Sequence, residues 1–166
     1  MRKRPDFLVF WKAWKVFLTF LILSFLPGTF YFFNFYSFLV YKQLSMFNAI
    51  FVLIWLYTVG IKLHQKLPAG VSSNLTVFRI LIYIGVILLF VWPLFSSFKN
   101  ALFIILINII LFYSFFFVAK ALVSIEKKSV AVFSDFVGSI VYMLVFPLGI
   151  WFLQPRIQVI FEDEIK

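Results

Sequence analysis

The sequence contains no cysteine and a single histidine, and only 13% of its 166 residues are charged. Without cysteine the chain has no disulfide, no thiolate nucleophile and no thiolate-ligated metal centre. The one histidine, His64, stands in "KLHQKLP" with no carboxylate beside it, and one imidazole alone makes a poor metal site. We therefore expect neither a metal nor a cofactor.

Acidic residues are also scarce, with six carboxylates against fifteen lysines and arginines. Enzymes and ion-coupled transporters that work within lipid usually carry ionisable groups at depth, because such groups are costly there and are kept for a function. Here all six carboxylates fall at or beyond the borders of the apolar segments. This pattern argues against a proton- or sodium-coupled carrier and favours a protein that is not an enzyme. An intramembrane enzyme that uses His64 with Glu126 or Asp135 is the last-ranked alternative.

Apolar and aromatic residues are abundant: 64% of the chain is hydrophobic, 23% is aromatic, and the mean hydropathy is +1.09. This composition lies far outside that of soluble domains. A helix that crosses a bilayer needs about 20 apolar residues. Segments of about this length cover 16–36, 46–63, 77–95, 101–119 and 136–153. We expect an all-α polytopic membrane bundle, a single domain over 1–166, with four transmembrane helices and a fifth hydrophobic segment.

The fifth segment, 136–153, leaves two structures open. Its roughly 18 apolar residues just suffice to cross a bilayer. However, Pro147, Gly149 and the nearby Pro155 are typical of a chain that bends. A full span would export the C-terminal tail, whereas a re-entrant hairpin would keep the tail on the side of the N-terminus. The preceding fourth helix is expected to extend beyond the lipid to about Lys128.

Positive charge predicts the orientation of the bundle. Lysines and arginines gather at the N-terminus and in the loops after the second and fourth segments, whereas only Lys42 and Lys99 fall on the other side of the first four helices. Because cytoplasmic loops carry the excess of positive charge, we expect a multi-pass protein of the cell inner membrane with a cytoplasmic N-terminus. The charges are spread over short loops and form no dense patch, which argues against a nucleic-acid partner.

Several residues are candidates for contacts within the membrane or at its surface. An amide near the middle of the fourth segment, at Asn108, needs a partner, so we expect it to face another helix or another subunit, with substrate contact as the alternative. The mixed-charge stretch from Glu126 to Asp135 either docks a cytoplasmic partner or forms a solvated connector. The candidate contacts to lipids or partner proteins are Asn108, Lys120, Glu126, Asp135, Pro147, Gly149, Trp151 and Arg156.

The C-terminal part carries an ordered set of motifs: "FVAKAL" at 117–122, Glu126, "FSDF" at 133–136 and "FPLGIWFLQPRIQ" at 146–158. In this order they resemble a family of small uncharacterised polytopic membrane proteins of Bacteroidota, in which the last motif reads "FPIGIWFIQPRIN". Residues 57–79 are similar to the middle of that family as well. The family often has Gly-Glu after "SDF", where this chain has Gly138-Ser139. The resemblance implies a host group and an architecture, and no activity.

The leading functional hypothesis is a non-enzymatic integral membrane protein that acts as a subunit or accessory of a larger inner-membrane complex. Its partners would be membrane lipids and other membrane proteins, because its loops are minimal and its surfaces are rich in phenylalanine. The alternative is a lipid-handling or small-molecule transport protein. In that case Asn108 and the bend at Pro147 and Gly149 would line a cavity, and basic residues such as Arg156 would hold phosphate.

Overall fold

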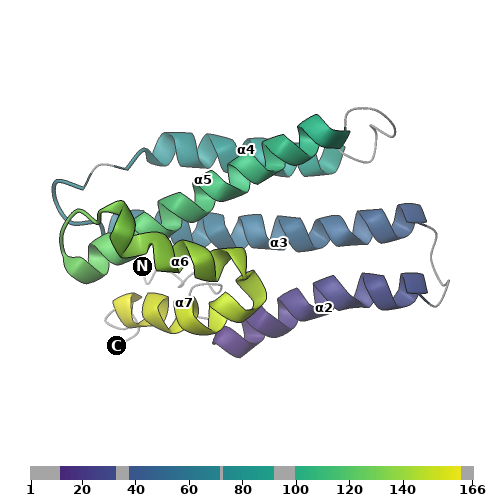
Figure 1. Cartoon of the computed structure of the whole chain (residues 1–166), viewed down its shortest axis with the longest axis horizontal. Coiled ribbons are helices and arrows are strands. Elements are labelled where there is room, and N and C mark those ends of the chain that lie inside the picture. Colours follow the sequence, from purple (N-terminus) through teal and green to yellow (C-terminus); the bar gives the residue numbers. More distant parts are fainter. Residues whose placement is uncertain (1–11, 33–37, 72, 92–99, 162–166) are drawn as a thin grey trace, which may run out of the picture.

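The computed structural model describes residues 12–32, 38–71, 73–91 and 100–161. Within these ranges the chain is all-α, without strands, as the sequence predicts. The helices are α2 (Ala13–Phe32), α3 (Phe38–Gln65), α4 (Leu75–Val91), α5 (Asn100–Lys127), α6 (Phe133–Leu144) and α7 (Phe146–Phe161). The longer helices run along the long axis of the molecule (Figure 1).

Helix α3 occupies the centre of the bundle and packs against α2, α4 and α5. Its buried side chains include Leu53, Trp55, Leu56 and Val59. Trp55 is fully buried, with its ring edge-on to Phe146 at a centroid distance of 5.2 Å. This tryptophan therefore belongs to the core and does not form part of an interfacial aromatic belt.

Two helices contain stretches long and apolar enough to cross a membrane: Met46–Gln65 of α3 and Leu102–Lys127 of α5. Shorter apolar helices in the described residues are Ala13–Leu23, Leu75–Val91 and Phe133–Leu144. A helix that is apolar on every face is typical either of a buried core or of a lipid environment. These lengths and compositions allow a membrane location.

The helix boundaries agree with the expected segments in part. Helix α3 begins at Phe38, earlier than the expected residue 46. Helix α5 continues to Lys127, as expected for an extension to about Lys128. It ends there because Lys128 adopts a left-handed conformation (φ 54°) and the N–H of Ser129 donates to the carbonyl of Ser124 at 3.2 Å. The expected segment ends at residues 36 and 95 and the turn around residue 99 lie outside the described residues.

The fifth hydrophobic segment is divided between two helices. Helices α6 and α7 are joined at Val145 and pack against each other as an antiparallel pair, the hairpin (Figure 1). At 1.5 Å per residue they are about 18 and 24 Å long, so each is shorter than the roughly 30 Å of a hydrocarbon core. A single helix across 136–153 is therefore wrong, and the chain returns to the end of the molecule where α6 begins.

A glycine and a proline explain where the hairpin turns. A Cβ atom on Gly149 would overlap the carbonyl oxygen of Tyr142, so the start of α7 can approach the end of α6 only with glycine at this position. Pro147 occupies the first turn of α7, where a missing backbone N–H costs nothing. Pro155 lies inside α7 without ending the helix. The bend expected at Pro147 and Gly149 thus occurs at Val145, just before them.

Candidate functional site

An arginine fork ties the hairpin to the end of α5. Arg156 of α7 donates from Nε to Glu126 Oε1 at 2.8 Å and from Nη2 to Glu126 Oε2 at 2.5 Å, while its Nη1 donates to Ser139 Oγ of α6 at 3.1 Å. Both charged side chains are about one-third exposed (33% and 32%). Two parallel hydrogen bonds between a guanidinium and a carboxylate are stronger than a single contact. Glu126 accordingly raises the pKa of Arg156 above its ordinary value.

A second ion pair fixes the entry into the hairpin. Lys127 Nζ lies 2.5 Å from Asp135 Oδ1, and Asp135 Oδ2 accepts the Val132 N–H at 3.0 Å at the start of α6. The hydrogen bond from Lys127, followed by that from Val132, lowers the pKa of Asp135. At the other end of the loop the buried Oγ of Ser124, in α5, accepts the Ala131 N–H at 3.1 Å. The loop is therefore held by contacts within the chain.

The far end of α7 is bound to the segment after α3. Lys66 Nζ donates to the carbonyl of Ile160 at 2.9 Å and lies 4.7 Å from the centroid of the Phe161 ring. A lysine at this position interacts favourably with the negative, C-terminal end of the α7 helix dipole. On the other side of α7, Trp151 is 46% exposed and packs on Phe17 of α2, with centroids 5.6 Å apart. The hairpin is thus attached to α2, α3 and α5.

These contacts decide between several sequence-based hypotheses. Arg156, expected to hold a lipid phosphate, is instead paired with Glu126. His64 Nδ1 lies 2.7 Å from Ser73 Oγ, so the structure does not join His64 to Glu126 or to Asp135 as the intramembrane-enzyme alternative requires. Ser139, three residues after the "FSDF" motif, accepts a hydrogen bond from Arg156.

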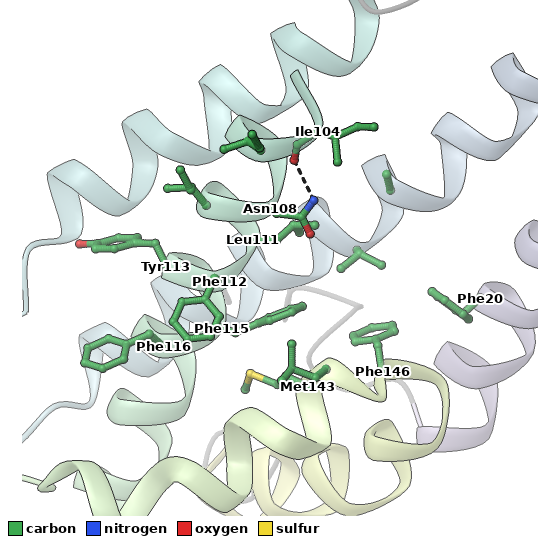
Figure 2. A pocket seen from close by; sticks show the side chains of 15 residues that line it. Phe20, Ile104, Asn108, Leu111, Phe112, Tyr113, Phe115, Phe116, Met143 and Phe146 are labelled. Carbon is green, nitrogen blue, oxygen red and sulfur yellow. Dashed lines mark hydrogen bonds between the residues drawn. The ribbon is translucent and has the colours of Figure 1, made fainter. Parts of the chain in front are cut away.

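An apolar groove of about 1060 Å³ opens beside α5, beyond the tip of the hairpin (Figure 2). Its walls come from α2, α3, α5, α6 and α7 and include Ala49, Phe112, Met143 and Phe146. The groove exists because α6 covers about 18 Å of a helix α5 that is about 42 Å long. Toward the N-terminal end of α5, past the tip of the hairpin, side chains such as Leu102 and Ile105 are exposed.

Asn108 lies in the wall of this groove, where its Nδ2 donates to the carbonyl of Ile104 at 2.7 Å (Figure 2). The amide is thus bonded to its own helix, and within the described residues it makes no hydrogen bond to another helix; contact with another subunit stays a prediction. Apart from this amide and the Tyr113 hydroxyl, the side chains that line the groove are apolar. One turn beyond Phe116, Lys120 lines a smaller pocket of about 140 Å³.

No family model, curated protein or solved structure matches this chain. Function is therefore argued from the groove and from the contacts around the hairpin. Ser73, Ser139 and Lys66 were missed as contact residues, since their partners are 9, 17 and 94 residues away in the sequence. Residues so far apart in the sequence form no short motif, so the sequence alone could not have revealed these contacts.

Proposed function

We propose that the chain is a multi-pass protein of a bacterial inner membrane, related to the Bacteroidota family that its motifs resemble, with a cytoplasmic N-terminus and a re-entrant hairpin. Support comes from the placement of the basic residues. The loop after α3 and the loop after α5 lie at one end of the molecule (Figure 1), and both carry lysine. Positive charge at one end is the pattern of a cytoplasmic face. The hairpin enters from that end and returns to it.

Within this membrane protein, we propose a lipid-handling function in which the groove accommodates an acyl chain. The observation that carries the proposal is the groove itself, whose volume lies at the upper end of the roughly 300–1,000 Å³ of small-molecule sites. At the depth of the bilayer core, the molecule that fills the groove must have no polar group that lacks a hydrogen-bond partner. Ile104 already accepts one N–H of the Asn108 amide, which leaves its second N–H and its oxygen as polar atoms in the groove wall.

The lining favours an acyl chain over a helix from a partner protein. Helices associate in membranes mainly where small residues let their backbones approach closely. Ala49 is the one small residue in the groove wall, and the others are phenylalanine, tyrosine, asparagine, methionine or branched aliphatic residues. A flexible chain fits between such side chains more readily than a rigid helix does.

The second candidate is the accessory-subunit function, and the outer surface of α4 and α5 favours it. Ile87, Phe90 and Leu102 are 60%, 63% and 63% exposed. Lipid covers such a surface in a monomer, and partner helices would cover it in a complex. The two candidates therefore differ in what lies against the groove and the outer face in the native membrane.

Site-specific photocrosslinking in the native membrane tests the proposal. A benzophenone analogue replaces Phe112 in the groove in one variant and Phe47 of α3 in the control, because both rings are 54% exposed and Phe47 lies outside the groove. We expect the probe at Phe112 to form a lipid adduct that survives detergent exchange before irradiation, whereas the probe at Phe47 loses lipid under the same treatment. Equal loss at both positions would overturn the proposal. A protein adduct at Phe112 would establish the accessory-subunit function instead.

A further inference from the structure

The small pocket next to the groove is built differently from the groove itself. It lies between α5 and the segment that leads into α4, and its lining includes Ser73, Asn74 and Lys120. Tyr113 and Phe116 line both hollows, so the two adjoin along these rings. Figure 2 shows the Tyr113 side chain pointing away from Met143 and Phe146. The apolar groove therefore adjoins a smaller pocket that contains polar side chains and a lysine.

Lys120 brings to this pocket a positive charge that no described residue compensates. Its side chain is partly buried, and its ammonium group makes no ion pair or hydrogen bond with any residue in the described ranges. The two described carboxylates are already engaged, Glu126 by Arg156 and Asp135 by Lys127. A partly buried charge without a partner is unfavourable, so an anion placed here would be stabilised.

Some of the remaining polar groups of the pocket already have hydrogen-bond partners. Asn74 Oδ1 accepts the Val77 N–H at 3.1 Å and caps α4, and Ser73 Oγ lies 2.7 Å from His64 Nδ1. The positive charge of the site thus comes from Lys120, whereas Ser73 and the Asn74 amide nitrogen supply neutral hydrogen-bonding groups. This arrangement matches one anionic oxygen group next to neutral polar atoms.

We propose that this pocket holds the phosphate of an anionic phospholipid whose acyl chain lies in the groove. The inference rests on the proposed lipid-handling function and adds the class of lipid and its orientation. A volume of about 140 Å³ corresponds to between four and five water molecules at roughly 30 Å³ each, which suits a phosphate group. From the level of Lys120 the path along α5 to Phe112 is about 12 Å, which is within the roughly 15 Å of one leaflet. A chain anchored at Lys120 therefore reaches the part of the groove around Phe112.

Native mass spectrometry of the full chain tests the inference. The protein is reconstituted in nanodiscs of equimolar phosphatidylglycerol and phosphatidylcholine, and the ratio of the two lipids retained after release is measured. We expect phosphatidylglycerol to be preferred and Lys120→Gln to lower that preference about fivefold. This factor corresponds to about 1 kcal/mol for one lysine near an anionic headgroup. Lys128→Gln is the matched control, because it removes the same charge from the same end of the molecule outside both hollows.

The outcomes separate this inference from the function on which it rests. If Lys120→Gln changes the lipid ratio no more than Lys128→Gln does, the phosphate site is wrong. The lipid adduct at Phe112 would still support the acyl-chain groove in that case. If the wild-type protein shows no preference for phosphatidylglycerol, the inference also fails. Loss of the Phe112 adduct in the wild-type background would remove the proposed function and this inference together.

Discussion

Breaking the ion pair between Glu126 and Arg156 should loosen the hairpin by a measurable amount. The two side chains are about one-third exposed, so the pair lies between a surface pair, which contributes about 0–1 kcal/mol, and a buried pair, whose disruption costs about 3–5 kcal/mol. Its two parallel hydrogen bonds place it above an ordinary surface pair. We expect Glu126→Gln to lower the free energy of unfolding by about 1–2 kcal/mol, with a coupling to Arg156→Gln of about 1 kcal/mol.

A double-mutant cycle measured by thermal unfolding in detergent checks this value. At about 2–4 °C per kcal/mol for a chain of this size, Glu126→Gln should lower Tm by about 2–8 °C. Arg156→Lys should have an intermediate effect, because lysine keeps the charge and loses the two parallel hydrogen bonds. Lys128→Gln serves as the control and should change stability by less than about 0.5 kcal/mol. A coupling energy below about 0.3 kcal/mol would show that the pair does not hold the hairpin, and would refute the reasoning.

Three further predictions concern the same region. Gly149→Ala should destabilise the protein by more than about 3 kcal/mol, because its Cβ would overlap the Tyr142 carbonyl. Gly138→Ala has open space around its Cβ and should stabilise the protein by up to about 1 kcal/mol. Equal Tm shifts for both variants would contradict the close approach of α7 to α6 at Gly149. Ser124→Ala should cost about 1–3 kcal/mol by leaving a buried N–H without its acceptor, and an unchanged unfolding midpoint in denaturant would disprove this. The pKa of Asp135 is lowered in the folded state, so its contribution to the free energy of unfolding is complete well above the ordinary pKa of 3.8 and is lost as the pH falls below that value. The difference in stability between wild type and Asp135→Asn should therefore become smaller in that pH range. A difference that does not change with pH would argue against the pairing with Lys127.

The sequence predicts those parts of the fold that follow from local composition. Long apolar runs give the all-α class, and the turn formers after His64 mark the loop between α3 and α4. The polar residues around Lys128 mark the end of α5. The start of α3 at Phe38 could not be located, because residues 38–45 carry polar side chains that lower hydropathy without preventing a helix.

The candidate site is less accessible to such reasoning. Gly149 was identified as part of a bend and permits the turn of the hairpin. Glu126, Asp135 and Arg156 were also candidates, yet all three form ion pairs within the chain. The pairing of Glu126 with Arg156 depends on a turn at Val145, and hydropathy cannot place a turn inside a continuous apolar run. Likewise, the groove follows from the unequal lengths of α5 and α6 after folding, and no residue pattern records it.

The turn at Val145 also bears on how the topology of this chain is counted. The proposed arrangement has five hydrophobic segments. If each of them crossed the membrane once, this odd number would place the two termini in opposite compartments. In the proposed arrangement the hairpin enters and leaves through the same face, so the number of crossings would be even. A reporter fused after the last residue should therefore be active in the cytoplasm, together with one fused before the first. In that arrangement neither α6 nor α7 would be long enough to be inserted alone, so the two would enter the membrane as a pair once α5 is in place.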